Sequence, residues 1–389
     1  MTDHLLEIAI VSPFVFRLLR GIERFSINLA NELAKLGQHV TLLTWDGPVK
    51  NTATLIAPDV RVIRLPTVRY YEAKWATIFY ALEFLRHRYD IVNLFFAGYG
   101  EAGSVRAGKR RQNFAVNFIV DYPPDLVPHR FREFQTTGLV SQLDHVIVKT
   151  RALVPVMDEL FGRPITVLPS GIDADYFSPD AAARAHARSE LGIAPDEKAL
   201  LTVAALEGRK GVRDIISAMP LLQGHKLHYL IVGDGPDRAE LTEQIRQAGL
   251  GAQVRLMGVQ SDVRPFYRAA DLFLLPSYGE AFPNALLEAM AMGLASVVSD
   301  QPPYDELVTS EFGVHVPIGA PKTMAAKVDA LLQDTPRRAA MGKAARVCVL
   351  AKYNWAMVAA RYLEFFENGG SSNDMNHASN SLCQTDWKS

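Results

Sequence analysis

The chain has 389 residues, of which 49% are apolar, and this length and composition provide for two hydrophobic cores rather than one. Its formal net charge is −1 but is divided unevenly, with 20 Lys and Arg against 16 Asp and Glu in residues 1–168 and 21 against 26 in the remainder. This mild basic excess falls short of the basic stripe of nucleic-acid-binding proteins, so no nucleic acid partner is expected.

Two cysteines, Cys348 and Cys383, lie far apart and have no neighbouring cysteine or histidine cluster. A disulfide framework and a zinc site are therefore excluded, and a reducing cytoplasm is favoured. The first residues lack the pattern of a cleaved signal, and no segment reaches the roughly 18 apolar residues of a membrane span. We expect a cytoplasmic protein.

The first 168 residues alternate between apolar strands and amphipathic helices. A strand at 8–11 is followed by a helix at 22–36, whose apolar residues recur at three- and four-residue spacing, and by a strand at 39–44. Further strands are expected at 90–95, 114–120, 145–148 and 166–168. The pattern predicts an N-terminal domain, residues 1–168, built on a parallel, doubly wound sheet.

Residues 169–195 lose this rhythm and are rich in Pro, Ala and Arg, which indicates an interdomain linker. A second Rossmann-like domain is expected over 196–352, then a helix over 353–368 that packs back on the first domain, and a disordered tail over 369–389. The expected strands of the second domain are 199–205, 227–232, 253–256, 271–275, 295–298 and 313–316, and its expected helices are 212–221, 236–248, 262–269, 284–292, 321–333 and 335–351. The fold class is α/β, with two doubly wound domains facing across a cleft.

The most informative segment runs from the strand at 271–275 to Gly293 and carries two glutamates, Glu280 and Glu288. Pro283 is of the residue type favoured at a first helical position. On one continuous helix, eight positions would rotate the glutamates about 80° apart, so the spacing requires Glu280 to lie in the loop before the helix. The pair then brackets a helix N-terminus, which favours an anion such as a diphosphate.

This segment resembles the donor-binding signature of the family 4 retaining glycosyltransferases, which have the GT-B fold, and the resemblance extends from Ile8 to about Phe366. It implies that Glu288 binds both ribose hydroxyls of a nucleotide sugar, that Glu280 contacts the transferred sugar, and that backbone N–H groups of 281–284 hold the sugar and diphosphate. The donor-binding residues implied here are Glu280, Ala281, Phe282, Pro283, Asn284, Leu287 and Glu288.

A second motif, residues 206–211, is similar to the family's Arg-Leu-x-x-x-Lys-Gly. Lys210 and Gly211 match, whereas Ala205 stands where the family has an arginine. The resemblance implies that Lys210 neutralises the diphosphate as its charge grows, without a metal ion. We expect Arg209 to supply the missing positive charge.

The remaining motifs of the resemblance are shorter. Gly21 is expected to contact the donor, although Arg20 replaces the family's neighbouring glycine. Asp121 is expected at the acceptor side of the reaction centre, although Val120 stands where the family often has histidine. Gly233 is expected to let the nucleotide pass close to the backbone, and Val259 to lie near the base.

The implied activity is a retaining transfer from a nucleotide-diphosphate sugar to a glycan, lipid-linked or small-molecule acceptor, with no cofactor, and with a hexose as the expected sugar. Glu280, Lys210 and Asp121 are the expected catalytic residues. Three alternatives stay open: a nucleotide-sugar epimerase, a sugar phosphorylase, and a non-catalytic nucleotide-sugar-binding scaffold. The missing G-x-G-x-x-G after the first strand argues against a dinucleotide-dependent dehydrogenase.

The front half also suggests contact with a membrane. Residues 69–88 place aromatic side chains beside basic ones, and a second basic cluster follows at 106–111. A basic, aromatic helix can lie on an anionic leaflet, although such a stripe is more often half core and half solvated. The residues concerned are Arg69, Tyr70, Lys74, Trp75, Phe79, Tyr80, Arg86, Arg88, Arg106, Lys109, Arg110 and Arg111.

Overall fold

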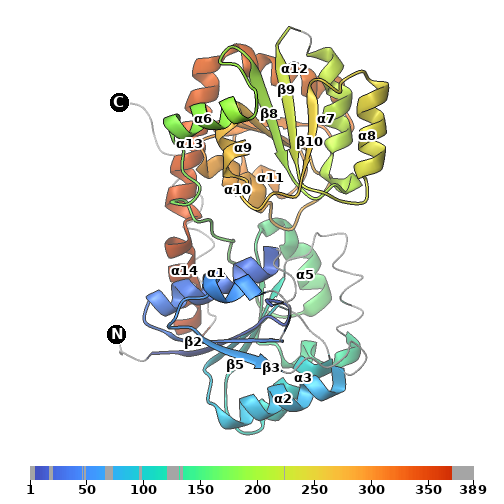
Figure 1. Cartoon of the computed structure of the whole chain (residues 1–389). Coiled ribbons are helices and arrows are strands. Elements are labelled where there is room, and N and C mark those ends of the chain that lie inside the picture. Colours follow the sequence, from blue (N-terminus) through green and yellow to red (C-terminus); the bar gives the residue numbers. More distant parts are fainter. Residues whose placement is uncertain are drawn as a thin grey trace. The chain divides into compact units, whose positions relative to one another are not determined.

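The computed structural model describes residues 5–16, 21–45, 47, 50–65, 73–95, 99–120, 131, 135–222 and 224–369. The chain divides into two compact units (Figure 1). Unit 1 comprises Met1–Gly171 and Trp355–Ser389, and unit 2 comprises Ile172–Asn354. Each unit is built on its own parallel sheet with interleaved helices, as the alternating pattern predicted.

Unit 1 contains a seven-stranded sheet in the order β3-β2-β1-β4-β5-β6-β7, in which each strand runs parallel to its neighbours. Its central strands are almost wholly buried and rich in Val, Ile and Leu, as expected of a parallel sheet covered on both faces, whereas the edge strand β3 is largely exposed or half-buried. The strands of the sheet are β1 (Glu7–Val11), β2 (His39–Trp45), β3 (Arg61–Leu65), β4 (Ile91–Leu94), β5 (Ala115–Val120), β6 (His145–Val148) and β7 (Ile165–Val167).

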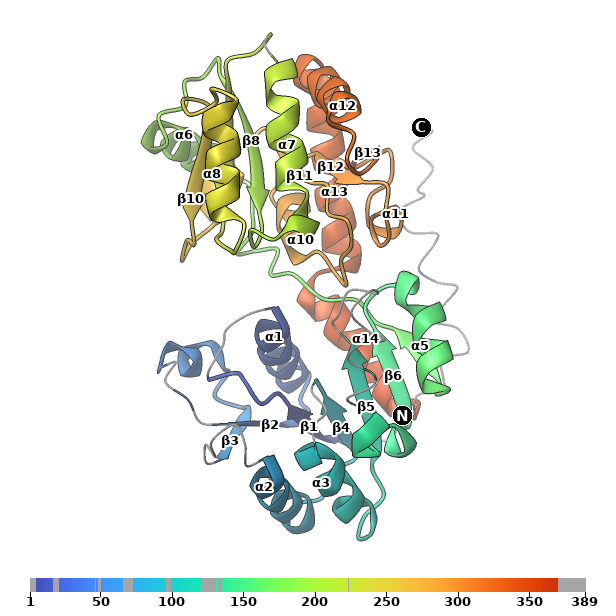
Figure 2. The ribbon, with the colours of Figure 1, turned by 90° about the vertical axis from the view of Figure 1, so that its right-hand side faces the viewer.

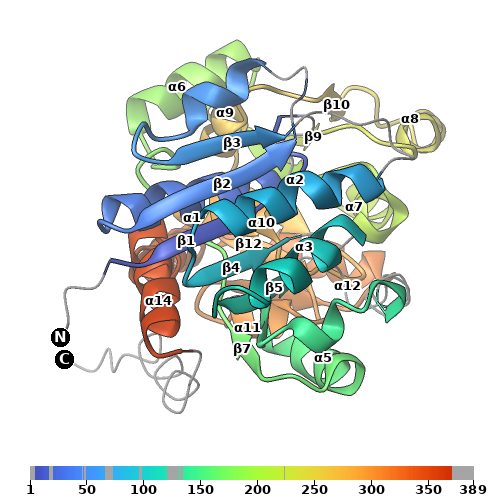
Figure 3. The same cartoon turned by 90° about the horizontal axis from the view of Figure 1, so that it is seen from below.

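Two groups of helices cover this sheet. On one side α1 (Gly21–Lys35) packs beside the last helix of the chain, α14 (Trp355–Glu367), where the rings of Phe25 and Trp355 lie 5.3 Å apart (Figure 3). On the other side α2 (Ala73–Arg86), α3 (Tyr99–Lys109) and α5 (Val154–Phe161) contribute side chains to a second core. Helix α14 therefore belongs to unit 1, although it follows unit 2 in the sequence.

Unit 2 contains a six-stranded parallel sheet in the order β10-β9-β8-β11-β12-β13 (Figure 2). Its strands are β8 (Lys198–Val203), β9 (Leu227–Val232), β10 (Val254–Gly258), β11 (Leu272–Leu275), β12 (Ser296–Ser299) and β13 (Gly313–Val316). Its helices are α6 (Ala181–Glu190), α7 (Val212–Ala218), α8 (Arg238–Gln247), α9 (Arg264–Ala269), α10 (Asn284–Ala291), α11 (Tyr304–Leu307), α12 (Pro321–Gln333) and α13 (Thr335–Lys352).

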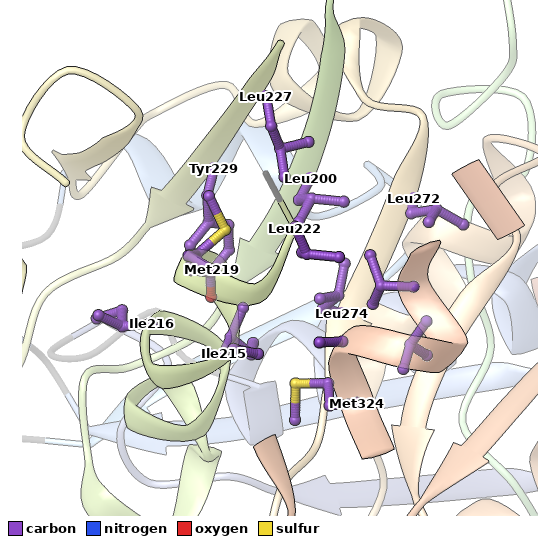
Figure 4. Close-up of a cluster of buried hydrophobic side chains, with 14 of the residues drawn as sticks. Leu200, Ile215, Ile216, Met219, Leu222, Leu227, Tyr229, Leu272, Leu274 and Met324 are labelled. Atoms are coloured by element: carbon purple, nitrogen blue, oxygen red, sulfur yellow. The ribbon is translucent and has the colours of Figure 1, made fainter. Parts of the chain in front are cut away.

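The core of unit 2 forms where the apolar sides of its central strands meet the helices. Figure 4 shows Leu200 of β8, Tyr229 of β9 and Leu274 of β11 beside Ile215 of α7 and Met324 of α12. All five side chains are at most 1% exposed. This packing fixes the strand ends, and hence the loops that leave them.

The structure corrects two parts of the sequence analysis. Helix α6 lies inside the range assigned to the linker, and it belongs to unit 2 because Arg184 and Arg188 bind Asp271 at 2.9 and 3.3 Å. Strand β3 was not expected, because Arg61 and Arg64 interrupt its apolar pattern. It lies at the edge of the sheet, where charged side chains are common.

The prediction that aromatic side chains of 69–88 face a membrane is wrong for two of them. Tyr80 is fully buried, and Phe79 packs against the core of unit 1. Arg69, Tyr70 and the predicted tail beyond Gly369 lie outside the described residues, as do the side chains of Lys74 and Trp75. Within the described ranges, no helix has the length and apolar character needed to cross a bilayer.

Candidate functional site

The strand order of unit 2 reverses between β8 and β11. From β8 the chain continues to β9 and β10 on one side, and from β11 to β12 and β13 on the other. Where the strand order reverses, the loops after the carboxyl ends of the two neighbouring strands run in opposite directions and leave a crevice between them. Open parallel sheets bind their ligands in this crevice. The loop after β8 carries Arg209 and Lys210, and the loop after β11 carries Glu280. The two motifs found in the sequence therefore flank one binding edge.

Glu280 is the centre of a charged cluster made with Lys210 and Arg209. The Lys210 ammonium nitrogen lies 2.5 Å from Glu280 Oε1, and Arg209 Nη1 lies 3.3 Å from Oε2. Glu280 is only 6% exposed, and these two cationic partners offset the loss of hydration that such burial costs a carboxylate. We call these three residues the Glu280 cluster; they carry one net positive charge.

Arg209 is held on a second side by Glu207, whose Oε2 accepts a hydrogen bond from Arg209 Nε at 2.9 Å. Arg209 Nη1 also donates to the carbonyl of Gly279 at 3.2 Å, and the Arg209 carbonyl accepts from the backbone N–H of Tyr278 at 2.7 Å. Burial alone lowers the pKa of Arg209, but the two glutamates outweigh it and raise the pKa overall. The guanidinium is thus charged and tied to the loop that carries Glu280.

Two glycines bring the backbone of these loops close to neighbouring strand ends. Gly211, directly after Lys210, has φ +67°, and a Cβ there would lie 2.2 Å from the carbonyl oxygen of Pro276. Gly233, directly after β9, has φ +132°, and its Cβ would lie 1.9 Å from the carbonyl oxygen of Ala204. Neither place can accept a side chain without moving the backbone. Both glycines are therefore required for the loop geometry.

Glu288 lies in the second turn of α10 and is oriented by a buried tyrosine. Tyr267 Oη lies 2.7 Å from Glu288 Oε2 and 3.1 Å from the carbonyl oxygen of Ala285. Burial raises the pKa of Tyr267 well above its usual value, and Glu288 raises it further, so the hydroxyl stays protonated and donates. Sequence reasoning missed Tyr267, because no local pattern links two residues 21 positions apart.

The other residues of the implied donor site lie around the start of α10. The helix begins at Asn284, where the expected range 284–292 begins, and Pro283 is its N-cap rather than its first helical residue. The N–H of Asn284 donates to the carbonyl of Phe282 at 3.1 Å. Ala281 and Phe282 are each 6% exposed, and Leu287 is fully buried in the core. Val259, which follows β10, is 78% exposed.

Two predicted residues belong to unit 1. Gly21 is the first residue of α1, whereas Asp121, which follows β5, lies outside the described residues. A residue that sequence reasoning did not select, Lys149, follows β6 directly. It is 2% exposed, and its ammonium nitrogen lies 4.3 Å from the ring centre of Phe25. The carboxyl edge of this sheet therefore carries a buried cation packed on an aromatic face.

Comparison with solved structures places this fold among known proteins. HepE of Anabaena, in complex with UDP and glucose, superposes with a TM-score of 0.78 at 17% identity, covering 93% of this chain and 99% of that one. Sucrose-phosphate synthase of Thermosynechococcus elongatus superposes with a TM-score of 0.76 at 22% identity, covering 93% and 98%. At such identities the likeness shows the fold, which is GT-B.

Two relatives found by sequence are also glycosyltransferases. An uncharacterized glycosyltransferase of Methanocaldococcus jannaschii is 30% identical over 57% of this chain, and the match spans 59% of that relative's length. The lipopolysaccharide core biosynthesis glycosyltransferase LpsE of Rhizobium meliloti is 24% identical over 91% of this chain and 98% of its own length. The first match therefore spans little more than half of the relative, whereas the second spans nearly all of it.

Two family models match consecutive parts of the chain. "Glycosyltransferase Family 4" matches residues 19–176, which covers most of the first part of unit 1. "Glycosyl transferases group 1" matches residues 183–347, which covers most of unit 2 and includes Lys210, Glu280 and Glu288. The chain belongs to the family 4 glycosyltransferases of the GT-B fold.

Proposed function

We propose that this protein is a retaining glycosyltransferase that moves a sugar, most simply a hexose, from a nucleotide-diphosphate sugar to a glycan or lipid-linked acceptor. The observation that carries the proposal is the Glu280 cluster at the strand-order reversal of unit 2, where the loop with Glu280 leads into the helix that carries Glu288. The UDP complex of HepE supports a uridine nucleotide as the first donor to test. The lipopolysaccharide role in the name of LpsE supports a glycan or lipid-linked acceptor.

In this proposal, the cationic groups of Lys210 and Arg209 receive the diphosphate. Within the described residues, Glu280 is the only hydrogen-bond partner of the Lys210 ammonium group, so two of its three N–H groups remain for phosphate oxygens. Arg209 takes the place of the arginine that the family has at position 205. As the glycosidic C–O bond to the phosphate breaks, these two cations stabilise the growing negative charge, and no metal ion is needed.

The two glutamates hold the two ends of the donor. Glu288 accepts hydrogen bonds from the ribose hydroxyls while Tyr267 fixes its carboxylate. Glu280, itself fixed by Lys210, accepts hydrogen bonds from hydroxyls of the sugar to be transferred. The acceptor oxygen then bonds to the anomeric carbon on the face the phosphate leaves, and its proton passes to the departing phosphate oxygen, which gives retention.

The test incubates the protein with UDP-, GDP- and ADP-sugars, with and without a glycan acceptor, in EDTA. We expect one donor to be consumed, EDTA to have no effect, and the anomeric proton coupling of the product to match that of the donor. Inversion of the anomeric configuration in the product, or loss of activity in EDTA, would contradict the proposed mechanism. Release of an epimerised sugar, a requirement for inorganic phosphate, or binding without turnover would instead identify an epimerase, a phosphorylase or a scaffold.

A further inference from the structure

Helix α2 of unit 1 has an apolar stripe on its exposed side. Ile78, Leu82 and Leu85 follow one another at four- and three-residue spacing, and they are 46%, 38% and 37% exposed. The opposite side of the helix fills the core with Tyr80 and Phe84, at 0% and 1% exposure. A helix on a protein surface normally presents polar residues to water, so this stripe requires an explanation.

A cluster of arginines stands at the end of this stripe. Helices α2 and α3 lie side by side (Figures 1 and 2), and Gln112 joins their C-terminal ends: its amide donates to the carbonyls of Phe84 and His87, and its Oε1 accepts from the N–H of Tyr89. The segments after the two helices are therefore neighbours. The exposed residues that we call the basic cluster are Arg86, Arg88, Arg110 and Arg111.

The exposed charge of this surface is positive. The two acidic residues of the helices point inward, with Glu83 at 9% and Glu101 at 3% exposure. Glu83 is already bound by Tyr89, at 2.8 Å. Within the described part of the chain, none of the four arginines of the basic cluster forms an ion pair. Apolar side chains next to unpaired arginines match the interior and the headgroups of an anionic bilayer.

We propose that the exposed side of α2, together with the basic cluster, docks unit 1 on an anionic lipid surface without crossing it. Ile78, Leu82 and Leu85 enter the boundary between headgroups and acyl chains, and the arginines bind lipid phosphates. The residues responsible differ from those that the aromatic pattern suggested, because Phe79 and Tyr80 face the core. This inference does not depend on the proposed reaction.

The test is flotation of the full chain with two sets of vesicles, phosphatidylcholine alone and phosphatidylcholine containing phosphatidylglycerol. We expect binding to the anionic vesicles only, and release at high salt, since exposed charges are screened. Each basic residue near such a surface contributes roughly fivefold to partitioning. The triple variant Arg88→Glu, Arg110→Glu, Arg111→Glu should therefore bind at least tenfold more weakly, as should the variant Ile78→Ser, Leu82→Ser, Leu85→Ser.

Matched controls change the same kinds of side chain in unit 2. The charge control replaces the exposed residues Lys322, Lys327 and Arg337 with glutamate, and the apolar control replaces Leu221, Val347 and Leu350, which are 53%, 54% and 40% exposed, with serine. Both controls should float like the unaltered chain, and circular dichroism checks that each variant is folded. Equal binding to both vesicle types, equal loss in variants and controls, or a stripe that instead drives self-association on a sizing column would overturn the proposal.

Discussion

The ammonium nitrogen of Lys210 lies 2.5 Å from the carboxylate of Glu280, although 70 residues separate them in the chain. The contact exists because β8 and β11 are neighbours in the sheet of unit 2, so that the loops after them meet. It joins the motif expected to hold the diphosphate to the motif expected to hold the sugar.

Replacing Lys210 with alanine should reduce kcat by about 10²–10³, the effect typical of losing one preorganised group that stabilises developing charge. It also leaves Glu280 with a single cationic partner, so donor affinity should fall as well. Initial-rate kinetics over a range of donor concentrations measure both effects. Arg213→Ala is the matched control, since Arg213 lies nearby in sequence but its side chain is 50% exposed and pairs with Glu240. Unchanged kcat in Lys210→Ala would argue against its assigned role.

Arg209 should substitute for the family's arginine, and the chain permits a rescue experiment. Arg209→Ala should lower kcat/KM about tenfold or more, because a cation bound to Glu280 is lost. Ala205 is exposed, so the family's arginine can be introduced there without disturbing the core. Adding Ala205→Arg to Arg209→Ala should recover much of the loss. An inactive double variant with normal folding would show that the two positions are not equivalent.

Tyr267→Phe should raise KM for the donor about three- to tenfold and leave kcat nearly unchanged, because the tyrosine orients Glu288 and does not reach the reacting atoms. Glu288→Gln should have a larger effect of the same kind. A comparison of the nucleotide with its 2′-deoxy analogue supplies a second readout. The unaltered enzyme should prefer the ribose form, and both variants should lose part of that preference. An effect on kcat alone would contradict a positioning role.

Gly211→Ala should destabilise unit 2 by about 2–4 kcal/mol, because its Cβ would collide with the Pro276 carbonyl and its φ is positive. Urea unfolding monitored by far-ultraviolet circular dichroism measures the change, since unit 2 (Ile172–Asn354) contains no tryptophan. Gly251→Ala is the control, since a Cβ at Gly251 meets open space. Its effect on the free energy of unfolding should remain below about 1 kcal/mol. Equal effects in the two variants would mean that the close approach at Gly211 is not required.

His145 should make the stability of unit 1 sensitive to mild acid. Its ring packs edge-on against Phe365 of α14 at 5.3 Å, and burial lowers its pKa below the usual 6.5. The unfolded chain therefore binds a proton that the folded chain does not, so stability is complete above about pH 6.5 and falls as the pH drops from there to the folded pKa. His145→Gln should flatten this part of the profile, and the exposed His186→Gln should not. Urea titrations from pH 8 to 5 provide the measurement.

Much of the fold could be predicted from the sequence because parallel strands are short apolar runs and their helices have a regular apolar period. The strands β6 and β9 were predicted with the residues that the structure gives them. Helix α6 was not, because its Ala- and Arg-rich sequence has no apolar face; it is held instead by Arg184 and Arg188 on Asp271. Such long-range polar contacts leave no periodic signal.

The residues of the candidate site likewise fall into those that the sequence could predict and those that it could not. Glu280, Glu288 and Lys210 could be selected because each belongs to a local motif, and the rotation between the two glutamates placed the first in a loop, where it lies. Tyr267 and Glu207 could not, since their roles arise only when separate loops fold together. The apolar stripe of α2 was likewise hidden, because a helix that is apolar on all sides does not reveal which face is covered.

The most direct test of donor binding at this site is a titration of the unaltered protein, Lys210→Ala and Glu288→Gln with UDP-, GDP- and ADP-sugars by isothermal calorimetry in EDTA. One of these donors should bind the unaltered protein, and each variant should bind it at least tenfold more weakly. Failure of all three donors to bind, or equal affinity in the unaltered protein and both variants, would contradict the proposed donor site.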